Sequence, residues 1–213
     1  MFRPVAAQED PSKALQAGIA KRISDPQMAA AVLLYAQGKI NEAITQLQII
    51  KEKSSKAPAH AQAEALRKDM ANVDSLKKIG DGLLKKQDLE KAAKTYREAL
   101  ELDARLVEDF ERTPSVSRRA IQDEMAAAAL RIGGPMARRS DLPRACAVFR
   151  TGFAFFKGSQ ALNEALAECS ANARLLLDGA HTCAELDRAL ALAVPPDGIT
   201  EGIAAQKSQL NCR

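Results

Sequence analysis

The chain has no tryptophan, and aromatic residues together make up only 4% of its 213 residues. This scarcity disfavours an all-β fold, because strands are enriched in aromatic and β-branched side chains. It also disfavours a surface that stacks the bases of single-stranded nucleic acid. The longest apolar run, Met28 to Ala36, is far shorter than the roughly 20 residues that cross a bilayer. We therefore expect no transmembrane segment in this chain.

The chain also lacks a strong excess of one charge. It has 31 basic and 27 acidic residues, a net charge of +4, whereas nucleic-acid-binding domains concentrate more positive charge on one face. The first residues are mixed in character and include Pro4, unlike the apolar stretch of a secretory signal. We expect residues 1–11 to be a linker or a disordered N-terminus.

Known catalytic motifs are missing too. The two histidines, His60 and His181, are far apart in the sequence, and neither belongs to a catalytic signature. The sequence contains no glycine-rich phosphate loop, no nucleophile elbow and no metal-binding helix motif. We therefore expect no enzyme activity, no small-molecule substrate, no cofactor and no metal site.

Helix-forming residues dominate what remains: alanine, leucine, lysine, glutamate and glutamine are abundant. Asp25-Pro26 is a typical helix start, and Thr182 to Glu185 has the spacing of a capping box. Between residues 59 and 86 apolar residues recur every three or four positions without a proline, which predicts one long helix. Gly133-Gly134-Pro135 is expected to break or kink the helix that begins near Ser117. The fold class is therefore all-α.

We expect a helical domain over 12–213, built from antiparallel hairpins. The hairpins span about 26–53, 59–111, 116–157 and 159–194, and a C-terminal capping helix spans 198–211.

A short pattern recurs along these hairpins. Gly38 to Ile44 aligns with Gln87 to Ala93 and with Ser140 to Cys146, and a bulky residue follows the alanine of each copy by four positions. The three alanines are Ala43, Ala92 and Ala145, and the bulky residues are Leu47, Tyr96 and Phe149.

This pattern resembles the tetratricopeptide repeat family, and Lys77 to Ala104 matches it best, with Ile79-Gly80 and Ala99 in family positions. Leu176 to Ala193 is a weaker fourth copy, with Ala189 in the position of the alanine. The alanines are 44 to 53 residues apart, longer than the roughly 34 of the family. The resemblance implies hairpins stacked as a short right-handed solenoid.

The resemblance also implies a partner-binding groove lined by the first helix of each hairpin. Carried over by position, its residues are Met28, Val32, Tyr35, Asp74, Lys77, Asp81, Leu84 and Lys85. Asp81 stands where family members that bind a C-terminal carboxylate have asparagine, so that specificity is not implied. The alternative is that the charged members are ordinary surface residues.

Basic residues crowd the middle of the chain with few acids between them. The candidate basic patch consists of Arg118, Arg119, Arg131, Arg138 and Arg139. It either attracts an acidic partner, a membrane surface or nucleic acid, or is a solvated helix face without a partner.

Four cysteines flank two expected helix turns symmetrically. Cys146 and Cys169 are equidistant from the turn at Lys157-Gly158, and Cys183 and Cys212 from the turn at Asp197-Gly198, so each pair can form a disulfide. Two bridges indicate an oxidising, extracytoplasmic compartment such as the periplasm. Reduced thiols would indicate the cytoplasm, and a zinc site that adds His181 is a further alternative.

The hypothesis favoured by the sequence is a non-catalytic scaffold that binds a partner protein or peptide, in a bacterial envelope-associated or signalling complex. The alternatives are a self-assembling structural subunit, which would be a homo-oligomer, and a nucleic-acid-binding repeat that uses the arginines.

Overall fold

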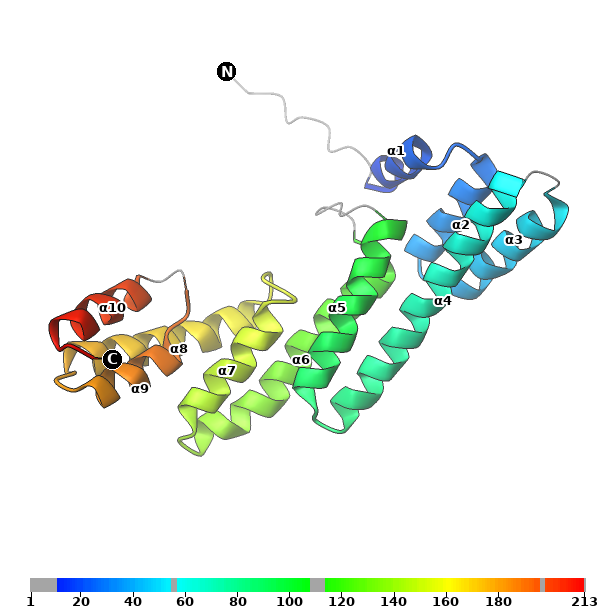
Figure 1. Cartoon of the computed structure of the whole chain (residues 1–213). Coiled ribbons are helices and arrows are strands. Elements are labelled where there is room, and N and C mark those ends of the chain that lie inside the picture. The colour runs from blue at the N-terminus through cyan, green and yellow to red at the C-terminus, as the bar shows by residue number, and fades with distance from the viewer. Residues whose placement is uncertain (1–10, 55–56, 108–113, 196–197, 213) are drawn as a thin grey trace, which may run out of the picture. The chain divides into compact units, whose positions relative to one another are not determined.

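The computed structural model describes residues 11–54, 57–107, 114–195 and 198–212, and in these residues it contains ten α-helices and no strand (Figure 1). They are α1 Pro11–Arg22, α2 Pro26–Ala36, α3 Ile40–Lys53, α4 Ala57–Lys85, α5 Leu89–Leu106, α6 Val116–Arg138, α7 Leu142–Phe153, α8 Gln160–Asp178, α9 Cys183–Leu192 and α10 Ile199–Gln209. The all-α prediction is confirmed. None of these described helices combines the length and the apolar character needed to cross a bilayer. The expected linker over 1–11 lies almost entirely outside the described residues.

The chain divides into two compact units. The first comprises Met1–Leu83 and Glu90–Ile121, and the second comprises Leu84–Leu89 and Gln122–Arg213. Each unit has its own hydrophobic core.

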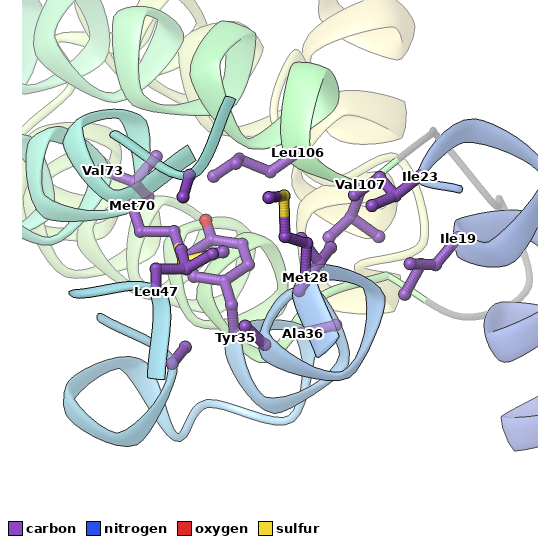
Figure 2. Packing of buried hydrophobic residues seen from close by; sticks show 14 of the residues in the cluster. Ile19, Ile23, Met28, Tyr35, Ala36, Leu47, Met70, Val73, Leu106 and Val107 are labelled. Atoms are coloured by element: carbon purple, nitrogen blue, oxygen red, sulfur yellow. The ribbon is translucent and has the colours of Figure 1, made fainter. Parts of the chain in front are cut away.

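The core of the first unit is formed by α1 to α5 (Figure 2). Asp25 caps α2 by accepting hydrogen bonds from the backbone N–H groups of Gln27 and Met28, as the sequence predicts. The ring of Tyr35 lies beside Met70 and Leu47. Since these side chains are inaccessible to solvent, α2, α3 and α4 are held together by a closely packed apolar seam.

The core of the second unit lies among the C-terminal part of α6 and α7, α8, α9 and α10. Helix α8 packs against α7 and α9, and α10 packs against α8 and α9. The capping box of α9 is present, since the Thr182 hydroxyl accepts from the Glu185 N–H while the Glu185 carboxylate accepts from the Thr182 N–H. Hydrogen bonds from the His181 N–H, the Thr182 hydroxyl and the Thr182 N–H to the Glu185 carboxylate lower the pKa of Glu185. The capping box fixes the start of α9.

Three helix turns share one backbone conformation. Gly38, Gln87 and Ser140, the first residues of the three aligned copies, have φ angles of +84°, +60° and +63°. In each copy the next helix begins two residues later, and its fourth residue is the buried alanine. Gln87 and Ser140 adopt a conformation that favours glycine. The three turns therefore have the same backbone geometry, although only the first has a glycine at this position.

A small residue faces the bulky residue in two of these hairpins. A Cβ atom on Gly133 would lie 2.5 Å from Cε1 of Phe149, and one on Gly80 would overlap the ring of Tyr96. Each glycine precedes its aromatic partner by sixteen residues and the left-handed turn residue by seven. In the first hairpin Ala31 has the place of the glycine, sixteen residues before Leu47 and seven before Gly38, and both Ala31 and Leu47 are fully buried. The repeat seen in the sequence is therefore a repeat of helix packing.

Of the two outcomes expected at Gly133-Gly134-Pro135, a break or a kink, the break is wrong, because α6 continues through these residues to Arg138. Gly133 is present because the ring of Phe149 occupies the space of a side chain. Pro135 removes one helical hydrogen bond without ending the helix. The chain turns only at Ser140, where the N–H groups of Arg139, Ser140 and Asp141 bond to carbonyls of the last turn.

The fourth copy does not share this register. Helix α9 begins at Cys183, six residues before Ala189, whereas α3, α5 and α7 each begin three residues before their alanine. The arrangement of all hairpins as a tetratricopeptide-like solenoid stays a prediction.

Candidate functional site

The expected groove residues of α2 are core residues. Met28, Val32 and Tyr35 are fully buried, so their assignment to an open binding groove is corrected. The Tyr35 hydroxyl donates to Oδ1 of Asp103 at 2.8 Å. Burial and the nearby Asp103 carboxylate raise the pKa of Tyr35, which therefore stays protonated.

Arg118 belongs to the same buried network. Its Nε lies 3.0 Å from Oδ2 of Asp103, and Ser115 donates to Oδ1 of Asp103 at 2.6 Å. Arg118 and Asp103 are 7% and 1% exposed. Arg118 is thus a buried ion-pair partner and not a member of a surface patch, which corrects the sequence prediction. The network ties α2, α5 and α6 together within the first unit.

Three of the predicted charged residues of α4, Asp74, Lys77 and Asp81, form ion pairs within that helix. Lys77 and Asp81 are 2.8 Å apart, and the hydroxyl of Tyr96 donates to Asp81 at 2.5 Å. Asp81 therefore holds the ring that packs on Gly80. Asp74 pairs with Lys78 at 2.6 Å.

The last two predicted groove residues of the α4 region differ in exposure. Leu84 is 3% exposed, so it is also unavailable for a partner. Lys85 is exposed. Of the predicted groove, only the charged residues of α4 reach the surface.

Glu64 makes a similar link between α3 and α4. It accepts hydrogen bonds from Arg67 at 2.7 Å and lies 3.0 Å from the Lys51 ammonium group. These hydrogen bonds lower the pKa of Glu64 from 4.5 to about 2.

The remaining predicted arginines are exposed. Arg119 lies in the first unit, and Arg131, Arg138 and Arg139 lie near the end of α6 in the second. Arg131 and Arg139 line a pocket of about 540 Å³ at the α6–α7 turn, here called the basic pocket. Its lining residues are Gln87, Arg131, Ile132, Pro135, Met136, Arg139 and Asp141, all in the second unit.

A second hollow lies on the first unit between α2 and α3, with a volume of about 650 Å³. Leu34, Ile49 and Ile50 supply its apolar side chains, and polar residues such as Asn41 and Glu42 surround them. Ile49 is 45% exposed. The groove was not predicted from the sequence. The available signal was Ile49, an apolar residue that does not follow the three-and-four spacing of the buried face of α3 and is therefore expected on its surface.

Both predicted cysteine pairs are disulfides. Cys146 is bonded to Cys169 with Cα atoms 6.0 Å apart, and Cys183 to Cys212 with Cα atoms 5.7 Å apart. The bridges join α7 to α8 and the start of α9 to the residue after the α10 C-terminal turn. Because all four sulfur atoms are used, the bridged protein has no thiolate for the alternative zinc site.

Arg150 provides a further link in the second unit. Its guanidinium donates to the carbonyls of Ala193 and Ala191 at 2.6 and 3.1 Å, at the C-terminus of α9. A cation is favourable there because the helix dipole ends in unpaired carbonyls. Burial lowers the pKa of Arg150.

Comparisons with protein-family models, curated proteins and solved structures found no match to this chain. No group of three histidine, cysteine or acidic side chains within the described residues is placed to hold a metal ion. The two candidate sites on the described residues are the basic pocket and the α2–α3 groove.

Proposed function

We propose that the protein is a non-catalytic scaffold that binds a partner protein or peptide through the surfaces of its helical hairpins. The observation that carries this proposal is the common register of the first three hairpins, with a left-handed turn residue, a buried alanine and a bulky residue at fixed offsets. Repeats of one packing unit stack into extended surfaces that suit protein partners. The proposal includes the predicted resemblance to tetratricopeptide repeats.

The exposed surfaces of the hairpins have the character of peptide-binding sites. The basic pocket and the α2–α3 groove each combine apolar side chains with polar or charged neighbours. Such combinations recognise peptides because the apolar part supplies binding free energy and the polar part supplies orientation.

The test is selection of peptides from a random display library on the oxidised full chain. We expect enriched peptides that bind saturably, with one peptide per chain, when measured by fluorescence anisotropy. A library that yields no saturable binder contradicts the proposal. The α2–α3 groove is checked with Ile49→Glu, and Lys13→Glu, at an exposed position of α1, is the matched control.

The proposed location is outside the cytoplasm, in a bacterial envelope compartment such as the periplasm. Its support is the pair of disulfides, since disulfides persist in oxidising compartments. The test is the intact mass of protein that is isolated from its source without reductant and denatured with a thiol-capping reagent. Two bridges leave no cysteine capped, whereas four capped cysteines would place the protein in a reducing compartment.

A further inference from the structure

The charges around the basic pocket do not cancel. Arg131 and Arg139 contribute two positive charges, and Asp141 is the only acid among the lining residues. The Asp141 carboxylate lies 3.4 Å from Nη1 of Arg144, whose side chain is 80% exposed and outside the lining. Neither Arg131 nor Arg139 forms an ion pair with any residue that the structure describes. A ligand in this pocket therefore meets two guanidinium groups that lack a counter-charge.

The pocket also has an apolar side. Ile132, Pro135 and Met136 are half-buried and line it together with the arginines. Met136 also packs against the core of the second unit, which fixes its position. A volume of about 540 Å³ accommodates a few side chains. A ligand that fills it carries apolar groups as well as negative charge.

Hydrogen-bond acceptors are present beside these donors. Pro135 has no N–H, so the carbonyl of Arg131, four residues earlier, lacks its usual helical donor. The later carbonyls are bonded, since Arg139 N–H donates to Pro135 at 3.2 Å and Asp141 N–H donates to Met136 at 3.0 Å. The side-chain amide of Gln87 adds both a donor and an acceptor.

The combination of guanidinium groups, apolar side chains and hydrogen-bond acceptors favours an acidic peptide over a nucleic acid as the ligand. The charged groups of a nucleic-acid backbone are phosphates, which only accept hydrogen bonds, and its bases stack on aromatic rings, of which the pocket lining has none. A peptide offers carboxylates for the two guanidinium groups, N–H groups for the side-chain oxygen of Gln87, and apolar side chains for the apolar side of the pocket.

We propose that the basic pocket binds an acidic segment of a partner protein, in which glutamate or aspartate alternates with an aliphatic residue. This proposal rests on the scaffold function above and names the class of partner for one of its surfaces. Arg131 and Arg139 bind the carboxylates, and Ile132, Pro135 and Met136 contact the aliphatic side chains.

The test uses the oxidised full chain and a fluorescein-labelled synthetic peptide in which glutamate and leucine alternate. Binding is measured by fluorescence anisotropy for the wild type and for Arg131→Glu with Arg139→Glu. The matched control is Arg174→Glu with Arg188→Glu, which reverses the same charge at exposed positions of α8 and α9 outside the pocket. We expect the pocket variant to bind about tenfold or more weakly and the control variant to stay within about twofold of the wild type.

Three results would overturn the proposal. They are no binding of the acidic peptide to the wild type, equal weakening in the two variants, and binding of a glutamine–leucine peptide as tight as that of the acidic one. A single-stranded oligonucleotide that displaces the peptide and loses affinity in the pocket variant alone would assign the pocket to nucleic acid instead. Circular dichroism melts check that all variants fold, and Arg131→Gln with Arg139→Gln provides a milder second variant.

The two proposals fail in different ways. A chain that binds library peptides but not the acidic peptide keeps its scaffold function and loses this assignment of the pocket. A chain that binds neither loses both.

Discussion

Replacing Gly133 with alanine adds one methyl group where α6 meets α7. The added Cβ would lie 2.5 Å from Cε1 of Phe149, so the ring has to move by roughly 1 Å to reach an ordinary contact distance. Phe149 is 5% exposed within the core of the second unit, so this movement displaces other core residues. Overpacking of this kind costs about 1–3 kcal/mol in the free energy of unfolding.

Gly134 provides a matched control at the next position of the same helix. A Cβ there would meet nothing closer than Nη1 of Arg138 at 3.7 Å. Alanine is favoured over glycine in a helix by about 1 kcal/mol, and both variants gain this amount. We therefore expect Gly134→Ala to be more stable than the wild type by about 1 kcal/mol, and Gly133→Ala to be less stable than Gly134→Ala by about 1–3 kcal/mol.

Urea denaturation followed by circular dichroism, with the disulfides intact, measures this difference. Phe149→Leu removes the ring, so in that background the two alanine variants should become equal in stability. Equal stability of Gly133→Ala and Gly134→Ala with Phe149 in place would refute the packing argument.

Three further perturbations test other parts of the structure. Gly80→Ala should destabilise relative to Gly82→Ala in urea denaturation, because only the first added methyl group overlaps the ring of Tyr96; equal stability would contradict the shared packing of the repeats. Pro135→Ala should stabilise by about 1–3 kcal/mol, since alanine supplies the helical N–H that proline lacks, and an unchanged urea midpoint would contradict this reasoning. Glu64→Gln should remove a contribution to stability that the wild type has above pH 4.5 and loses as the pH falls to about 2, because the folded-state pKa lies below the ordinary one. Melting temperatures of both proteins across that range check the last point, and parallel curves would refute it.

Local signals in the sequence predicted the helix starts and the disulfides. Asp25-Pro26 and the capping box at Thr182 act through atoms within a few residues, so they can be identified without knowing the fold. The cysteine pairs follow from symmetry about two turns, which needs only the assumption of antiparallel helices.

The errors come from contacts that the sequence does not show as local. From the sequence, Arg118 is expected to be a surface charge. In the structure it is buried in an ion pair with Asp103, which lies fifteen residues earlier. Gly133 precedes Phe149 by sixteen residues, as Gly80 precedes Tyr96. This equal spacing indicates that Gly133 makes room for a ring within a continuous helix, and it was the available signal against a helix break. Met28 and Tyr35 are on the first helix of a hairpin, but the inner face of that helix packs into the core. The basic pocket could not be predicted, because its shape depends on a turn at Ser140 and on Gln87 from another turn.

The common left-handed turns have a consequence for how the hairpins can vary in length. The small residue and the bulky residue of each hairpin are sixteen positions apart and flank the turn, and in two hairpins the glycine lies directly against the aromatic ring. The alanines Ala43, Ala92 and Ala145 are nonetheless separated by 49 and then by 53 residues, a difference close to one helical turn of about 3.6 residues. The packing around the turn thus fixes the register of the two helices of each hairpin. At the ends of the helices far from that turn, whole helical turns can be added without disturbing the packing that defines the repeat.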